Sequence, residues 1–317
     1  MTPKRKFYSK GFQHIFQISV DRGIIFYTDE DCLVFFTILC CLAVKYRVRI
    51  VAVCIMKNHF HILGHFGSEE NMELFLNALC SVYARKYNGR YFRSGQLFKK
   101  SFGSAPKYGE EDIYDCIIYI YNNPIPKKAR ESAIEYRWNF LAYMDSKSPF
   151  SKQADHSSVS DELRSRFSFV ERIHSSGQYI DYDVLDTLRA GLSTEQYLQL
   201  LDHIIVVYNI IDYSLLTSKW ETRRAVSDML RLVKGSEYST DEDGSREDYR
   251  NYERMNEIVC EAGFDLSRFR FDSKNADMRQ IERLRRKAKF LANPSTIELD
   301  KYFHSGEYTR RLCPKTP

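Results

Sequence analysis

The sequence predicts an α+β protein, with a small sheet and its helices in residues 1–145 and a mostly helical region in residues 161–317. Strand-like and helix-like hydrophobic spacings alternate before residue 145, whereas almost every periodic segment after residue 160 has helical spacing. Residues 146–160 are polar, rich in serine and without periodicity, which is typical of a linker. A chain of 317 residues with 44% hydrophobic content is long enough to build a core in each part.

The first part predicts seven elements. Strands are recognised by alternating or continuous apolar runs, and helices by apolar residues at i, i+3 and i+4 with acidic residues at their start. In chain order we expect a strand at 14–20, a helix at 29–46, strands at 47–54 and 55–66 joined by the turn Met56-Lys57-Asn58, a helix at 71–88, a strand at 96–102 and a helix at 110–121. Asn123-Pro124 ends the last helix. This order is the split βαβ, ferredoxin-like arrangement with one additional helix.

The second part predicts helices throughout. Their ranges are 161–175, 183–191, 194–209, 213–234, 248–262 and 277–292. Ser295 and Glu298 then form a capping-box pattern, and Ser305-Gly306 offers a turn before a second helical segment. This pattern predicts a helix-turn-helix near residues 295–312, with a plain helical bundle ending in a basic helix as the alternative.

Cysteine spacing and hydropathy indicate a cytoplasmic protein. The eight cysteines contain no CxxC pair, and Met1 is not followed by a secretory signal, so we expect reduced thiols. The longest apolar run, around residues 32–44, is too short to cross a bilayer. We therefore expect neither a membrane association nor a disulfide framework.

Positive charge is concentrated in the first part. Residues 1–145 contain 20 Lys/Arg and 14 Asp/Glu, and residues 74–109 contain seven Lys/Arg, several aromatic residues and no acid. Cations that contact phosphates and aromatic rings that stack on bases are typical of proteins that bind single-stranded nucleic acid. The DNA-binding residues predicted from this segment are Arg85, Lys86, Arg90, Arg93, Lys99 and Lys100. The alternative is a solvated helix face whose aromatic residues belong to the core.

His59 and His61 are separated by one apolar residue in a predicted strand. Side chains at i and i+2 project from the same face, so the two imidazoles stand side by side and can hold one metal ion. Surface histidines on an edge strand are the alternative, but the flanking run is apolar and places the strand inside the fold.

Tyr119 lies near the end of the helix at 110–121. A phenol has a pKa near 10 and is a weak nucleophile, but a neighbouring divalent ion stabilises the phenolate and polarises a phosphate. A tyrosine beside a metal therefore suits phosphodiester transesterification. The alternative is that Tyr119, or Tyr121, only packs on the sheet.

The ordered motifs resemble those of a known family. Met56-Lys57-Asn58-His59-Phe60-His61-Ile62-Leu63, Gly95-Gln96-Leu97-Phe98 and Tyr119-Ile120-Tyr121-Asn122-Asn123-Pro124 are similar to the motifs of single-tyrosine HUH transposases of the insertion-sequence 200-like type. The REP-associated tyrosine transposases, with M-P-N-H-x-H-L-L and Y-I-x-x-N-P, are the most similar group. The resemblance covers residues 5–145, and Lys57 stands where the family usually has proline.

This resemblance implies a mechanism and its residues. His59 and His61 are expected to be metal ligands, completed by Asn123, with Mg²⁺ or Mn²⁺ as the ion and no nucleotide cofactor. Tyr119 is expected to attack single-stranded or hairpin DNA and to form a 5′-phosphotyrosine intermediate that another 3′-OH can resolve. Relatives form dimers, so a homodimer is one expected assembly.

Two other functions fit the same residues. A replication-initiation or relaxase-like nickase uses the same metal and tyrosine, and a non-catalytic protein can bind single-stranded nucleic acid through the sheet and its aromatic residues. A covalent protein–DNA adduct distinguishes the two enzymes from the binding protein.

Overall fold

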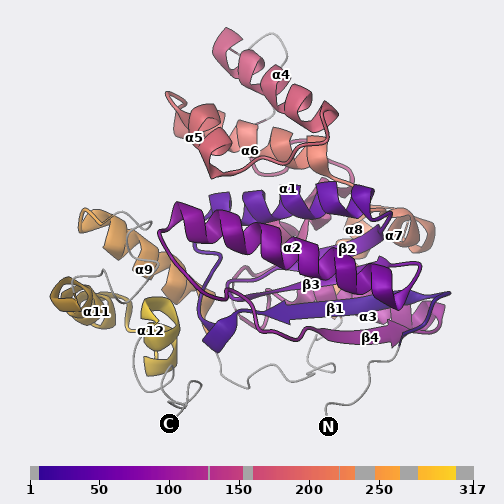
Figure 1. The fold of residues 1–317 in the computed structure, drawn as a ribbon, viewed down its shortest axis with the longest axis horizontal. Helices are drawn as coiled ribbons and strands as arrows, with labels where there is room; N and C mark the ends of the chain where they lie inside the picture. The colour runs from indigo at the N-terminus through magenta and orange to yellow at the C-terminus, as the bar shows by residue number, and fades with distance from the viewer. Residues whose placement is uncertain are drawn as a thin grey trace.

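A four-stranded antiparallel sheet forms the centre of the molecule, described here from a computed structural model (Figure 1). The structure describes residues 7–127, 129–152, 160–220, 222–232, 247–264 and 278–304. The strands are β1 (Phe12–Ile18), β2 (Arg49–Ile55), β3 (His59–His65) and β4 (Gly103–Lys107). Their order in the sheet is β2-β3-β1-β4, so β1 and β3 are the two inner strands.

Helices cover both faces of the sheet (Figure 1). α1 (Asp29–Lys45) and α2 (Glu69–Arg90) pack together on one face, where the ring of Phe35 lies 4.7 Å from that of Phe60 in β3. α3 (Glu110–Asn122) packs against β2 and β3 on the other face. Both sides of β3 are therefore covered, and its residues 59–64 are buried.

The remaining described elements are helical. The short 3₁₀ segments are Val20–Arg22, Ala133–Glu135, Arg137–Asn139 and Leu141–Met144. The α-helices are α4 (Asp161–Ser175), α5 (Tyr182–Arg189), α6 (Thr194–Tyr208), α7 (Ser214–Lys219), α8 (Arg223–Leu232), α9 (Tyr249–Glu261), α11 (Met278–Ala292) and α12 (Thr296–Phe303). Within the described ranges, no helix is long and apolar enough to cross a membrane.

The predicted order of strands and helices in residues 1–145 is observed, with one strand misplaced. The prediction of a strand at 96–102 is wrong, because the fourth strand is Gly103–Lys107. Leu97 and Phe98 are buried but belong to an irregular segment, in which an isolated bridge pairs Phe98 with Ser19. The observed strand has Pro106 at the edge of the sheet, where a missing N–H is tolerated.

The helix predicted at 213–234 is also wrong as a single element, because α7 ends before α8 begins. Trp220 between them has an extended backbone, and its ring packs edge-on against Tyr114 at 5.5 Å. Trp220 thus packs on α3 at the point where α7 has ended.

The structure leaves two predictions about the second part untested. α12 begins with the predicted capping box between Ser295 and Glu298, but residues 305–317, which would complete the helix-turn-helix, lie outside the described residues. Residues 153–159 of the predicted linker also lie outside them. The domain division at 146–160 therefore stays a prediction.

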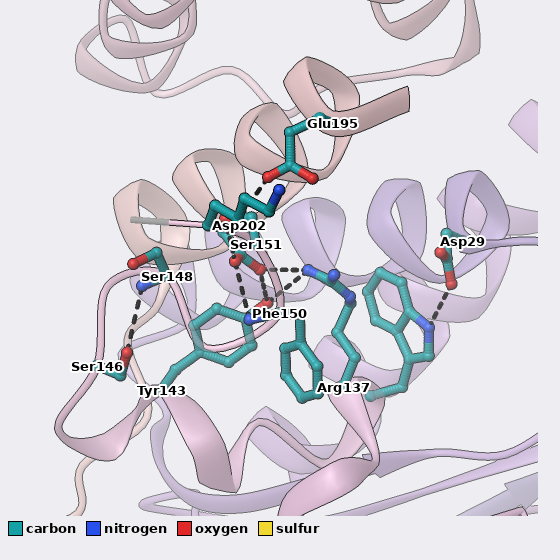
Figure 2. Close-up of polar contacts among 11 residues, drawn as sticks. Asp29, Arg137, Tyr143, Ser146, Ser148, Phe150, Ser151, Glu195 and Asp202 are labelled. Atoms are coloured by element: carbon teal, nitrogen blue, oxygen red, sulfur yellow. Dashed lines mark hydrogen bonds and ion pairs between the residues drawn. The ribbon is translucent and has the colours of Figure 1, made fainter. Parts of the chain in front are cut away.

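Asp202 of α6 joins the segment after α3 to the helical region (Figure 2). Its carboxylate pairs with Arg137 and accepts hydrogen bonds from Tyr143 Oη at 2.7 Å, the Phe150 amide at 3.1 Å and Ser151 Oγ at 2.8 Å. The side chains of Asp202 and Arg137 are 1% and 9% exposed, so each needs the other to offset the cost of burying its charge.

We expect Asp202→Ala to lower the free energy of unfolding by about 3–5 kcal/mol, because it leaves the Arg137 guanidinium buried without its carboxylate. Urea unfolding measures this loss. Asp186→Ala is the matched control: its ion pair with Arg90 is partly exposed, so we expect a loss below about 1 kcal/mol. Equal losses in the two variants would contradict this role for Asp202.

Candidate active site beneath the sheet

Strand alternation and register gather three histidines on the face of the sheet that α3 covers. His59 and His61 share this face of β3, and their ring centroids are 5.0 Å apart. In the pairing of β1 with β3, Phe16 is opposite His61 and His14 is opposite Leu63, so His14 also lies on this face. The rings of His14 and His61 are stacked at 5.2 Å.

The end of α3 brings Tyr119 and Asn123 to these histidines. The Tyr119 ring lies edge-on to His61 at 5.5 Å and to His14 at 5.7 Å. One helical turn later, Asn123 Nδ2 is 3.2 Å from His61 Nε2. The sequence-predicted tyrosine, histidines and asparagine thus lie together in the fold. They are buried, since Tyr119, His61 and Asn123 are 7%, 2% and 6% exposed.

Tyr121 does not share this position. It lies two residues further along α3 and is fully buried. Burial raises the pKa of its phenol well above the ordinary value. Of the two tyrosines that the sequence leaves open, Tyr119 is therefore the one with ring contacts to the imidazoles.

The hydrogen bonds of Asn58 fix the tautomer of His59. Asn58 Nδ2 donates to the Arg22 carbonyl at 2.8 Å, so Asn58 Oδ1 is the atom that faces His59 Nδ1, at 2.7 Å. A carbonyl oxygen can only accept, so His59 carries its proton on Nδ1 and keeps a lone pair on Nε2.

A parallel chain of contacts orients His61. Asn123 Nδ2 can only donate, so His61 Nε2 accepts and holds the lone pair. His61 Nδ1 then carries the proton and donates to His14 Nε2 at 3.0 Å. His59 and His61 consequently have the same tautomer, with a lone pair on Nε2 and the proton on Nδ1 directed to a protein acceptor.

A strained turn supplies the acceptor for Asn58. Asp21 and Arg22 both have left-handed backbone conformations, at φ 56° and 53°, which are uncommon for residues other than glycine. This turn directs the Arg22 carbonyl to Asn58, while the Ser19 amide donates to the Asn58 carbonyl at 2.9 Å. The side chain and the backbone carbonyl of Asn58 are thus both hydrogen-bonded to the segment from Ser19 to Arg22, which holds the turn before His59 in place.

The cations predicted to bind DNA divide into two groups. Lys86 forms an ion pair with Asp181, the residue that caps the start of α5, and Arg90 forms one with Asp186 within α5. The Asp181 hydrogen bond raises the pKa of Lys86, and Arg93 contacts Asn88 and the Gln96 carbonyl. The second group, which is exposed, is Arg85, Lys99 and Lys100.

Most aromatic residues of the same segment are in the core. Tyr83, Tyr87, Tyr91 and Phe98 are buried, whereas Phe92 and Tyr108 are 87% and 60% exposed. Residues 74–109 thus lack acids in part because the carboxylates that pair with the cations of α2 come from α5. DNA contact by the six predicted cations stays a prediction.

Sequence reasoning missed the roles of His14 and Asn58. His14 begins the alternating segment that predicts the first strand. The sequence does not show that His14 lies beside His61, because this contact depends on the pairing of β1 with β3. Asn58 lies in the motif before His59, where the sequence predicts only a turn residue. Its side-chain hydrogen bond to the Arg22 carbonyl depends on the fold and leaves no signal in the sequence.

We expect His59 and His61 to carry a proton on Nδ1 and a lone pair on Nε2, because Nδ1 of each ring faces a protein acceptor. Two-bond ¹H–¹⁵N correlation spectra of protein labelled in its histidines measure the tautomer. His65 is an internal control with the opposite expectation, because its Nε2 faces the Ser9 carbonyl at 3.1 Å and must donate. A proton on Nε2 of either His59 or His61 would refute the assignment.

Comparisons with known proteins support the resemblance in the motifs. Residues 10–123, from β1 to the residue that follows α3, match the family model described as "Transposase IS200 like". A solved structure described as "Structure of the REP associates tyrosine transposase bound to a REP hairpin" is similar with 12% identity and a TM-score of 0.39, covering 50% of this chain and 98% of that chain. No curated protein matches the chain. Residues 10–123 are therefore similar to the IS200-like transposase family, and this similarity ends at the residue that follows α3.

Proposed function

We propose that this protein is a DNA transposase that cuts and rejoins single-stranded or hairpin DNA through a covalent bond to Tyr119. The observation that supports it best is the contact of the Tyr119 ring with the rings of His61 and His14, inside a segment that matches a transposase family. In this proposal the sheet is a ferredoxin-like βαββαβ unit. Its two inner strands carry the imidazoles, and α3 is the additional helix that carries the nucleophile.

The side chains beside Tyr119 fit a divalent cation. His59 and His61 both hold their lone pair on Nε2, the arrangement found in histidines that ligate metals. In this structure Asn123 Nδ2 faces the His61 lone pair, so Asn123 would complete the set through its amide oxygen only after its amide group turns. An oxygen ligand favours an ion such as Mg²⁺ or Mn²⁺ on a phosphate substrate. When bound, such an ion would polarise the scissile phosphodiester and withdraw negative charge from it.

Tyr119 performs the transfer in this mechanism. Its Oη forms a bond to the phosphorus as the bond from phosphorus to the 3′ oxygen breaks. The phenol loses a proton and the departing 3′ oxygen gains one, so one phosphodiester replaces another and no co-reactant is consumed. A second 3′-OH can attack the phosphotyrosine and release Tyr119 in the reverse step.

Little of Tyr119 meets solvent in this structure, since the residue is 7% exposed. α8 packs beside α3, and Asn122 Nδ2 donates to the Leu230 carbonyl at 2.9 Å. Separation of α8 from the end of α3 is one motion that would open the site.

We expect Tyr119→Phe to abolish the covalent adduct with a 3′-labelled single strand in the presence of Mn²⁺, because the variant lacks the attacking oxygen and only the fragment that carries the 3′ label stays joined to the protein. Denaturing gel electrophoresis and mass spectrometry of the linked peptide measure the adduct. Tyr121→Phe is the matched control and should retain the adduct. An adduct that survives the first change and disappears with the second would assign the nucleophile to Tyr121.

We expect His14→Leu to weaken Mn²⁺ binding by about 10- to 100-fold, because His61 loses the acceptor that holds its proton on Nδ1. Calorimetric titration of the protein without DNA measures the affinity, so the result does not depend on cleavage. His14→Gln, which restores an acceptor oxygen, should recover part of the loss, and His65→Gln should have no effect. Unchanged affinity in a folded His14→Leu protein would exclude this role.

A further inference from the structure

One face of α11 presents cations around an exposed phenylalanine. Ile281, Leu284 and Ala288 form the buried face of this helix. At 100° per residue the opposite face is centred near Phe290, which is 86% exposed. The outward positions are Arg279, Glu282, Arg283, Arg286, Lys287 and Phe290, and all are exposed. We call this set the α11 basic face.

Other charged side chains of α11 are used to hold the helix in place. Arg285 forms an ion pair with Asp300 of α12, and Lys289 Nζ donates to the Pro294 carbonyl at 2.7 Å. The helix contains six Lys/Arg and one Asp/Glu. On the α11 basic face Arg286 pairs with Glu282, whereas Arg283 and Lys287 are exposed.

Contacts along the chain place α11 near the histidine end of the sheet. α11 packs on α9 and α12, and these three helices lie together beside that end (Figure 1). In α12, the Lys301 and Tyr302 carbonyls accept from the Ile24 amide and from Tyr27 Oη. The amides of Ile25 and Phe26 donate to the Lys57 carbonyl, two residues before His59. α11 therefore lies at the same end of the sheet as the start of β3, with α12 between it and the segment that contacts Lys57.

We infer that the α11 basic face binds the single-stranded DNA that extends from the cleavage site, with its cations on backbone phosphates and Phe290 stacked on an unpaired base. This inference rests on the proposed function for the identity of the polyanion. A membrane surface shares the attraction to cations, but helices that lie on membranes insert a free apolar face. The apolar face of α11 is already covered by α9 and α12.

The test is the salt dependence of binding to a fluorescent oligonucleotide without metal, in a Tyr119→Phe background that cannot cleave. Arg283→Gln/Lys287→Gln should weaken binding at least fivefold and reduce the slope of log affinity against log salt by about 1.4, since each lost contact to a single strand contributes about 0.7. Phe290→Ala should weaken single-strand binding about fivefold and leave binding to a blunt duplex unchanged.

Arg164→Gln/Arg172→Gln on α4 is the matched control, because it removes the same charge from exposed positions of another helix. Equal loss in the two double variants, or no loss in either, would overturn the proposal. So would loss of binding to phosphatidylglycerol vesicles with DNA affinity retained. This test measures binding and not cleavage. If the α11 variants weaken binding as expected but the adduct assay finds no covalent product, the proposed function is refuted and the inference about α11 is not.

Discussion

The antiparallel pairing of β1 with β3 is the constraint on which the candidate site depends. Side chains alternate between the faces of a sheet, so a shift of one residue in this pairing would turn His14 away from His61. Burial fixes the register, because Ile15 and Phe60 occupy the opposite face and are fully buried against the helices. Gly103 of β4 lies opposite Phe16, and a Cβ there would meet the Phe16 ring at 2.0 Å. The site thus depends on the same packing that selects the fold.

The segment from Ser19 to Tyr27 connects this site to the C-terminal helices. On one side its backbone binds the turn that precedes His59, and on the other it binds α12. Gly23 allows this close approach, because a Cβ at that position would lie 2.5 Å from the His304 ring. The helical region is therefore attached to the backbone that orients a candidate ligand. Two sets of backbone hydrogen bonds connect α12 to the turn before His59: one joins Lys301 to Ile24, and the other joins Ile25 and Phe26 to Lys57.

Sequence patterns predicted the elements that carry strong local signals and missed those that depend on distant partners. The strand pattern identified β3, so the nearness of His59 to His61 could be predicted. An acidic start followed by apolar residues at helical spacing identified α3. The sequence Gly103–Lys107 has no alternation of apolar residues, and it is a strand because it pairs with β1. His14 acquires its contact from a register between strands that lie far apart in the chain.

The two basic helices show why charge runs are ambiguous in a sequence. Lys86 and Arg90 of α2 lie in a segment without acids, yet their carboxylates come from α5, 95 and 96 residues downstream. Fixed partners of this kind satisfy the cations and leave less charge for a polyanion. In α11 the pattern is reversed, since Arg285 and Lys289 secure the helix while Arg283 and Lys287 project on the side away from the core. Phe290 among them is 86% exposed in the part of the chain that the structure describes. Carboxylate partners from another helix, rather than the number of cations, thus separate a structural use of charge from a surface suited to DNA.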